Sequence, residues 1–179
     1  MMPVLLNLNH YQLWDIAGVD GLQVAKSLFG DQVGCIAPFH SIETTIAGCP
    51  CSVLRLCEGN FRIVWQGDSN ILEQAFQLQG ERRAWLKRFD WLGAIALSDS
   101  VGLTHLIKIA VAKPPHRLEG MLVNCAAPAR IEGAAVLVWR HFVLGQSAFE
   151  LHTAVKDLEA IKLTCSPPYK GRDSSGVTP

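Results

Sequence analysis

Apolar and polar positions follow the same order of periodicities in two stretches of this chain. Residues 61–66 alternate in the manner of a half-buried strand, with Phe61, Ile63 and Trp65 on one side. Residues 19–29 instead repeat apolar side chains at helical spacing and are followed by a glycine, a typical helix stop. The predicted elements of the first stretch are a strand at 11–16, a helix at 19–29, strands at 41–47, 52–57 and 61–66, and a helix that begins near residue 71.

The second stretch repeats that order. Residues 149–153 again alternate, with Phe149 and Leu151 opposite Glu150 and His152. Its predicted elements are a strand at 103–111, a short helix opened by Pro114 and Pro115, strands at 129–133, 135–142 and 149–153, and a closing helix that presents Val155, Leu158 and Ile161. Both stretches therefore read β-α-β-β-β-α, which predicts an α+β fold of two pseudo-repeated halves with antiparallel sheets.

This pattern divides the chain into four parts. We expect a first repeat half at 1–80, an amphipathic connector at 81–93, a second repeat half at 94–165 and a flexible tail at 166–179. The tail is rich in proline, glycine and serine, a composition that does not support a packed core on its own.

Composition narrows the classes of function. The 16 basic and 16 acidic residues leave a formal net charge of zero, which argues against a nucleic-acid protein, because such binding rests on an excess of Lys and Arg. No apolar run approaches the roughly 20 residues that a membrane span needs. The first residues lack the pattern of a signal peptide, so we expect a cytoplasmic protein whose six cysteines are mostly reduced.

Three of those cysteines lie close together in the sequence. Cys49, Cys51 and Cys57 offer soft ligands, to which Cys35 or His40 could be added, and a metal-binding regulator is one hypothesis. The spacing is not that of a zinc knuckle and no second pair answers it. Buried cysteines that act as small apolar side chains are the preferred interpretation.

Other chemistry-bearing residues do not form a catalytic motif. His141 and His152 are predicted on neighbouring strands of one hairpin, close enough to share a ligand or to form a hydrogen-bonded pair. A position at the surface or at a rim is the preferred interpretation of each histidine. Ser98, Asp99 and Ser100 precede His105, but the Gly-x-Ser-x-Gly elbow of many serine hydrolases is absent, as is any phosphate-binding glycine loop. No catalytic residue is therefore predicted.

The connector combines aromatic and basic residues. On a helix, Trp85, Phe89 and Leu92 would share one face, with arginines and Lys87 around them. Such a face suits a partner protein or a nucleic-acid strand, and it also suits a helix that simply packs on the core. We favour the packing role, with partner binding next.

Several segments together resemble the gamma subunit of heterotetrameric sarcosine oxidase, within the folate-binding aminomethyltransferase superfamily. The first half contributes a strand rich in Leu and Trp that includes a glycine turn, at residues 54–65. The opening of the second half contributes residues 96–100, 106–109 and 114–122, and its closing hairpin contributes residues 136–140 and 149–152. Two departures are Lys113-Pro114, where the family favours Gly-Pro, and Ala96, which replaces an aspartate.

The resemblance implies a non-catalytic structural subunit of a flavin-dependent sarcosine oxidase or N-methyl amino-acid dehydrogenase complex. It implies that no cofactor is bound by this chain alone, and that FAD, FMN, NAD, folate and zinc belong to partner subunits. The residues expected to bind those partners are Trp85, Arg88, Phe89, Trp91, Pro167, Pro168 and Tyr169.

A second hypothesis is a stand-alone folate-binding-like protein that holds a pterin or a similar small molecule between its halves. Such a site needs a buried carboxylate to pair with ring nitrogens, and the candidates are Glu43, Asp99 and Glu132.

Overall fold

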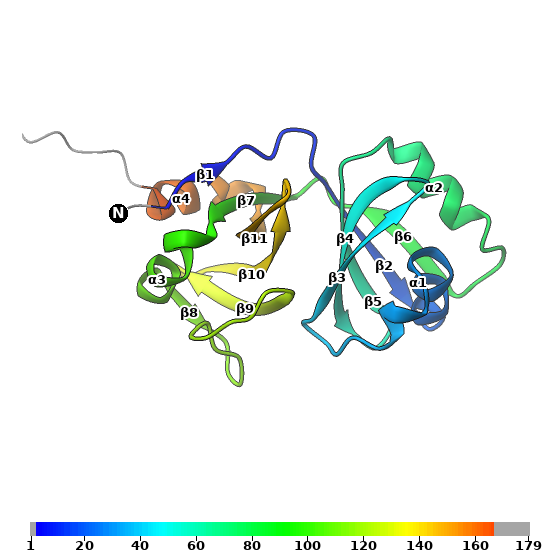
Figure 1. The fold of residues 1–179 in the computed structure, drawn as a ribbon, viewed down its shortest axis with the longest axis horizontal. Coiled ribbons are helices and arrows are strands. Elements are labelled where there is room, and N and C mark those ends of the chain that lie inside the picture. The colour runs from blue at the N-terminus through cyan, green and yellow to red at the C-terminus, as the bar shows by residue number, and fades with distance from the viewer. Residues whose placement is uncertain (1–2, 167–179) are drawn as a thin grey trace, which may run out of the picture.

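Two antiparallel sheets and four α-helices make up residues 3–166, the part of the chain that the computed structural model describes (Figure 1). The predicted α+β class is confirmed. The elements of the first half are β1 (Leu5–Leu6), β2 (Gln12–Gly18), α1 (Gly21–Phe29), a 3-10 turn η1 (Asp31–Gly34), β3 (Ser41–Ile46), β4 (Cys49–Cys57), β5 (Asn60–Trp65) and α2 (Ser69–Gln77). Those that follow are β6 (Ala84–Arg88), β7 (Leu92–Ser98), α3 (Asp99–Ile109), β8 (Ala110–Ala112), β9 (Cys125–Ile131), β10 (Ala134–Val143), β11 (Gln146–Ala154) and α4 (Val155–Cys165).

The two sheets share a strand order. The first sheet runs β3-β4-β5-β2-β6 and the second runs β1-β7-β11-β10-β9-β8, with every neighbouring pair antiparallel. In each, a three-strand meander returns to pair with the strand that opened its half. The edge strands are exchanged: β1, from the start of the chain, borders the second sheet, and β6, which follows α2, borders the first. That the halves arose by duplication stays a prediction.

Strand alternation decides what each sheet face covers. In β5, Phe61, Ile63 and Trp65 point to the helix-covered side, where they join α1 and α2 in one apolar core. In β11, Phe149 and Leu151 do the same for the second sheet against α3 and α4. Helices therefore cover the outer face of each sheet.

The inner faces of the two sheets pack on each other, so the molecule has helices at its two ends and the sheets between them (Figure 1). Leu13, Leu54 and Val64 from the first sheet meet Ala126 and Trp139 from the second. This apolar contact holds the halves together, since all five side chains are almost fully withdrawn from water.

Part of the second half differs from the prediction. Residues 103–111 were expected as a strand, but most of them belong to helix α3, and the strand that opens this half is β7. The β-branched residues near Val111 suggested a strand, whereas Leu103 and Leu106 recur at helical spacing and pack on the core. The helix predicted after Pro114 is also wrong: the chain there makes turns, with a cis bond between Pro114 and Pro115.

The connector is a strand. Residues 84–88 form β6, which pairs with β2 along the edge of the first sheet, so the helical face predicted for Trp85, Phe89 and Leu92 is wrong. Alternation along β6 instead turns Ala84 and Leu86 toward the core and Trp85 away from it. The division of the chain at 80, 93 and 165 stays a prediction. No helix among the described residues has the length and apolar character needed to cross a bilayer.

Candidate functional site

A continuous chain of polar side chains runs between the packed inner faces of the two sheets. It joins residues from both halves through hydrogen bonds and ion pairs. Its members, in spatial order, are Asp15, Arg62, His152, Glu150, His141, Glu43 and Ser52.

Glu150 is the centre of this polar chain. Its Oε2 lies 2.7 Å from Nε2 of His141, and its Oε1 lies 2.6 Å from Nε2 of His152. Glu150 and His152 are two residues apart on β11 and so share the inner face, while His141 projects from the same face of β10. All three side chains are fully buried. The two predicted histidines are therefore brought together, but through a carboxylate rather than by a direct bond. The surface or rim position preferred for each of them is wrong, because the first sheet covers this face of the hairpin.

Burial and hydrogen bonding compete in setting the charges here. Burial disfavours the charged form of Glu150, but the two histidines outweigh it and lower the pKa of its carboxyl to about 2. Burial likewise opposes a charge on His141, yet hydrogen bonds to Glu150 and Glu43 raise the pKa of its imidazole to about 9. The core of the site is thus an imidazolium between carboxylates.

His152 has the opposite character. Burial lowers the pKa of its imidazole, and the nearby Arg62 adds to that effect. A neutral imidazole that donates from Nε2 to Glu150 leaves Nδ1 as an acceptor, and Nη1 of Arg62 lies 3.5 Å from it. The hydrogen-bond partners therefore assign the tautomer.

Arg62 is held by a two-pronged ion pair with Asp15. Its Nε lies 2.7 Å from Oδ1 and its Nη2 lies 3.1 Å from Oδ2. The two residues are direct cross-strand partners on β5 and β2. Burial raises the pKa of the Asp15 carboxyl in spite of this arginine. A paired guanidinium at this position carries positive charge to the edge of the seam.

At the other end, Glu43 of β3 connects the polar chain to the first sheet. Its Oε1 lies 3.2 Å from Nδ1 of His141, and the Ser52 hydroxyl donates to its Oε2. The Trp139 ring stacks on the His141 ring at a centroid distance of 3.8 Å, and its Nε1 donates to Oγ of Ser41 over 2.9 Å. The imidazolium is therefore covered by an aromatic face, a favourable cation–π arrangement.

Each end of the polar chain reaches a cavity. Glu43 and Ser52 line a cavity of about 610 Å³ with Tyr11, whose hydroxyl pKa is raised by burial and by the carboxylates of Glu150 and Glu43. Arg62 and His152 line a second cavity, of about 950 Å³, on the other side. Both volumes are in the range of small-molecule sites.

The predicted cysteine site is not assembled. Within residues 3–166 no group of three His, Cys, Asp or Glu side chains is placed to hold a metal ion. Cys51 is buried and its thiol pKa is raised by burial to about 12, whereas Cys57 is exposed. The two cysteines are six residues apart on the extended strand β4, which puts them on the order of 20 Å apart, too far to share a metal ion.

The three candidate carboxylates lie apart. Glu43 is at the seam, but its side chain is 35% exposed, so it is not the buried carboxylate that the small-molecule hypothesis expects. Asp99 lies on the outer face of the second sheet, where Arg140 at 2.9 Å and Ser147 at 2.6 Å lower its pKa in spite of partial burial. Glu132 is exposed in the turn between β9 and β10.

Of the residues predicted to bind a partner, Trp91 lines the 950 Å³ cavity, and Trp85, Arg88 and Phe89 lie in or next to the edge strand β6. Trp85 is 57% exposed and Trp91 is 54% exposed, and the Phe89 ring meets Trp91 edge to face. Arg88 is exposed at the end of β6. Pro167, Pro168 and Tyr169 lie outside the described residues. Partner binding at any of these positions stays a prediction.

Sequence reasoning missed Glu150, Arg62 and Asp15. Alternation marked Arg62 and Glu150 as solvent-facing, because they stand opposite the apolar positions of strands 61–66 and 149–153, and no face was assigned to Asp15 in strand 11–16. The available signal was the number of ionisable residues in one hairpin, with His141, Glu150 and His152 all predicted on facing strands.

Comparison with known proteins gives a fold likeness. No protein-family model matches the chain, and no curated protein does. Among solved structures, the glycine cleavage system aminomethyltransferase T from Bartonella henselae superposes with a TM-score of 0.76 at 14% identity over 93% of this chain. The present chain spans 46% of that enzyme's length.

A second match is to a chain whose length is similar to that of the present protein. The heterotetrameric sarcosine oxidase from Corynebacterium sp. U-96, in complex with pyrrole 2-carboxylate, includes a chain that matches with a TM-score of 0.63 at 16% identity. The match covers 88% of this chain and 78% of that one. At such identities these likenesses show the fold alone: this chain shares its fold with part of the aminomethyltransferase and with a chain of that sarcosine oxidase, as the resemblance led us to expect.

Proposed function

We propose that this protein is a non-catalytic structural subunit of a flavin-dependent sarcosine oxidase or N-methyl amino-acid dehydrogenase complex. The observation that carries the proposal is the extent of the match to a chain of heterotetrameric sarcosine oxidase. That match takes in most of both chains, whereas the chain spans less than half of the aminomethyltransferase. The sarcosine oxidase chain is therefore matched over the larger share of its own length, although the aminomethyltransferase superposes with the higher TM-score.

The polar chain between the two sheets supports a structural role. Its carboxylates, imidazoles and guanidinium bond to one another, and Glu150 spends both oxygens on histidines of its own hairpin. Polar groups that bond to one another in this way fix how the two halves pack together, because a buried charge is stable only when its partners are in place. The flavins, nicotinamide, folate and zinc of the complex would then be held by other subunits.

The exposed aromatic residues support a partner. Trp85 and Trp91 each leave more than half of the side chain in water, and tryptophan is enriched at the energetic centres of protein interfaces. Trp85 lies in the first sheet's edge strand β6 and Trp91 lies three residues beyond its end, so one companion chain could cover them together.

Affinity purification of the tagged chain from its native host tests the proposal. We expect a companion flavoprotein in stoichiometric amount, identified by flavin absorbance and mass spectrometry. The double variant Trp85→Ser with Trp91→Ser should lower its recovery, while the control Leu78→Ser, at the 85% exposed residue that follows α2, should not. A chain that elutes alone would refute the proposal.

The non-catalytic part has its own test. In the purified complex, Glu43→Gln should leave the turnover number unchanged, because the carboxylate is placed as a partner of His141 and Ser52 and not of a substrate. A large loss of turnover in an intact complex would show a catalytic role.

A stand-alone pterin-binding protein is the second candidate. The observation in its favour is the position of Glu43, 35% exposed at the wall of the 610 Å³ cavity between the halves, with Tyr11 and Gln66 nearby. Folic acid should then raise the melting temperature of the isolated chain, and Glu43→Gln should abolish the shift. Without a shift in the wild-type chain, this candidate falls.

A further inference from the structure

The 950 Å³ cavity lies where the inner face of the second sheet extends beyond the first. Residues Val111, Arg130 and Ala135 are consecutive cross-strand partners on β8, β9 and β10, and they share this face with Leu137 and His152. Small side chains at the floor leave room above the sheet. The cavity is therefore a continuation of the seam that no strand of the described chain fills.

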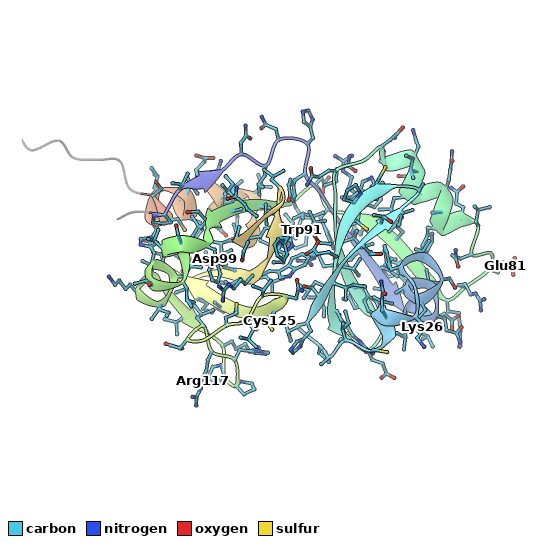
Figure 2. The ribbon with its side chains drawn as sticks, in the orientation of Figure 1. Lys26, Glu81, Trp91, Asp99, Arg117 and Cys125 are labelled. Carbon is cyan, nitrogen blue, oxygen red and sulfur yellow. The ribbon has the colours of Figure 1, made fainter. Side chains whose placement is uncertain are left out.

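One wall of the cavity is aromatic and apolar. Figure 2 labels Trp91 between the two sheets, and this side chain borders the cavity beside Leu92. Val111, 74% exposed, and Pro114 stand on the opposite side. A flat apolar body of modest size would remove this surface from water.

The charge around the cavity is predominantly positive. Lys113, Arg130 and Lys156 line it, and none of them lies within ion-pair distance of a carboxylate in residues 3–166. Arg130 is fixed by a 2.7 Å hydrogen bond from its Nη1 to the Gly133 carbonyl. Asp157 is the one acidic side chain on the lining. Three unpaired cations around one apolar hollow stand out in a chain of zero net charge.

Helix α4 adds to this field. It begins at Val155, between the cavity-lining residues Ala154 and Lys156, and the methyl side chain of Ala154 cannot cap the first turn by a hydrogen bond. The Val155 amide is taken by the Trp91 carbonyl at 2.8 Å, which holds the tryptophan against the helix. The positive end of the helix dipole and Lys156 therefore meet at the same place as the aromatic wall.

We propose that this cavity binds a small organic anion, a carboxylate with a flat apolar body, whose charge lies among Lys113, Arg130 and Lys156 and whose body lies on Trp91. The apolar surface supplies affinity and the cations supply selection by charge. The site does not rest on the proposed subunit role, since its lining comes from this chain alone.

Isothermal titration of the full chain with 1-naphthoate tests the site. The neutral probe 1-naphthalenemethanol, which has the same ring, should bind at least about tenfold more weakly, because it lacks the charge that the cations attract. Binding of naphthoate should quench tryptophan fluorescence, and Trp91→Phe should remove that quench. Equal affinity for the two probes would overturn the proposal.

Lys156 and Asp157 are neighbours on α4, and removing their charges should change naphthoate binding in opposite directions. Lys113→Gln combined with Lys156→Gln should weaken naphthoate binding about tenfold, while Asp157→Asn should strengthen it about threefold by removing the carboxylate that repels the ligand. Lys162→Gln is the matched control, because Lys162 lies on the same helix but pairs with Glu159 and is absent from the lining. A control that weakens binding as much as the double variant would reduce the effect to overall charge and contradict the site.

Discussion

At the centre of the second sheet both faces are buried, and they are chemically unlike. The outer face presents Val138, Phe149 and Leu151 to α3 and α4, and its core is apolar. The inner face presents Trp139, His141, Glu150 and His152 to the first sheet. Adjacent residues of one strand thus make apolar contacts on one face of the sheet and ionic contacts on the other.

This difference separates two tasks. An apolar face accepts many packings of similar volume, so it stabilises a helix layer without selecting one arrangement. The ionic face is satisfied only when Glu43, Arg62 and Ser52 arrive at the correct atoms, and a misplaced half would leave buried charges unpaired. We infer that the inner face specifies how the halves are matched.

Replacing Glu150 should cause the largest loss of stability that is specific to the inner face. Glu150→Gln puts an amide N–H against one of the two imidazole N–H groups, and His141 loses a charged partner. We expect a loss of about 3–5 kcal/mol in the free energy of unfolding, measured with urea.

Leu151→Ala, on the outer face, is the control for that variant. It should cost about 2–5 kcal/mol through the cavity that it leaves, with no dependence on pH. The loss in Glu150→Gln should change with pH, because it alters how tightly His141 holds its proton. Parallel pH profiles for the two variants would contradict a distinct ionic role for the inner face.

Arg62→Met is the next largest change. It leaves the Asp15 carboxylate buried without its cation and should cost about 3 kcal/mol. Adding Asp15→Asn should recover part of that loss, since the uncompensated charge is then gone. If the double variant were as unstable as the sum of the single ones, the pair would not act as a unit.

The outer face was largely predictable from the sequence and the inner face was not. The alternation of Phe61, Ile63 and Trp65 and of Phe149 and Leu151 located strands β5 and β11, because burial on the helix side imposes that pattern. The same rule assigned their neighbours to water. A second sheet covers them instead, and no local pattern reveals that layer.

The missed helix has a similar cause. Residues 99–109 contain apolar side chains on several sides, so their periodicity is weak, and only Gly102 and Leu106 become fully buried. The contacts across the seam are also long-range. Arg62 and His152 are 90 residues apart in the sequence, whereas residues joined by a turn are only a few apart. Predicting it requires the packing of the two sheets, which the sequence pattern alone does not supply.

The proton on His141 should make the inner face sensitive to base. The pKa of this imidazole is raised to about 9 in the folded chain, above the usual value of 6.5, so the folded state keeps a proton that the unfolded state releases. Its contribution is complete below about pH 6.5 and is lost as the pH rises through 9. We expect a fall on the order of 2 kcal/mol between these limits.

Urea unfolding of the wild-type chain and of His141→Asn at several pH values measures this contribution. Burial also raises the thiol pKa of Cys51 and Cys165, which adds a fall of the same sign at high pH. The difference between the two proteins cancels that common term. A difference that stays constant from pH 6.5 to 9 would show that His141 does not hold the extra proton.

The smallest expected effect concerns the one neutral polar link in this part of the seam, between Trp139 of the second sheet and Ser41 of the first. Ser41→Ala leaves the buried Trp139 Nε1 without its acceptor and should cost about 1–2 kcal/mol. In Trp139→Phe the donor itself is gone, so adding Ser41→Ala to that background should cost little. This double-mutant cycle isolates the hydrogen bond from the stacking on His141, because the phenylalanine ring retains an aromatic face. Should Ser41→Ala cost as much with phenylalanine as with tryptophan, the bond would add nothing, and the match between the halves would rest on the charged groups alone.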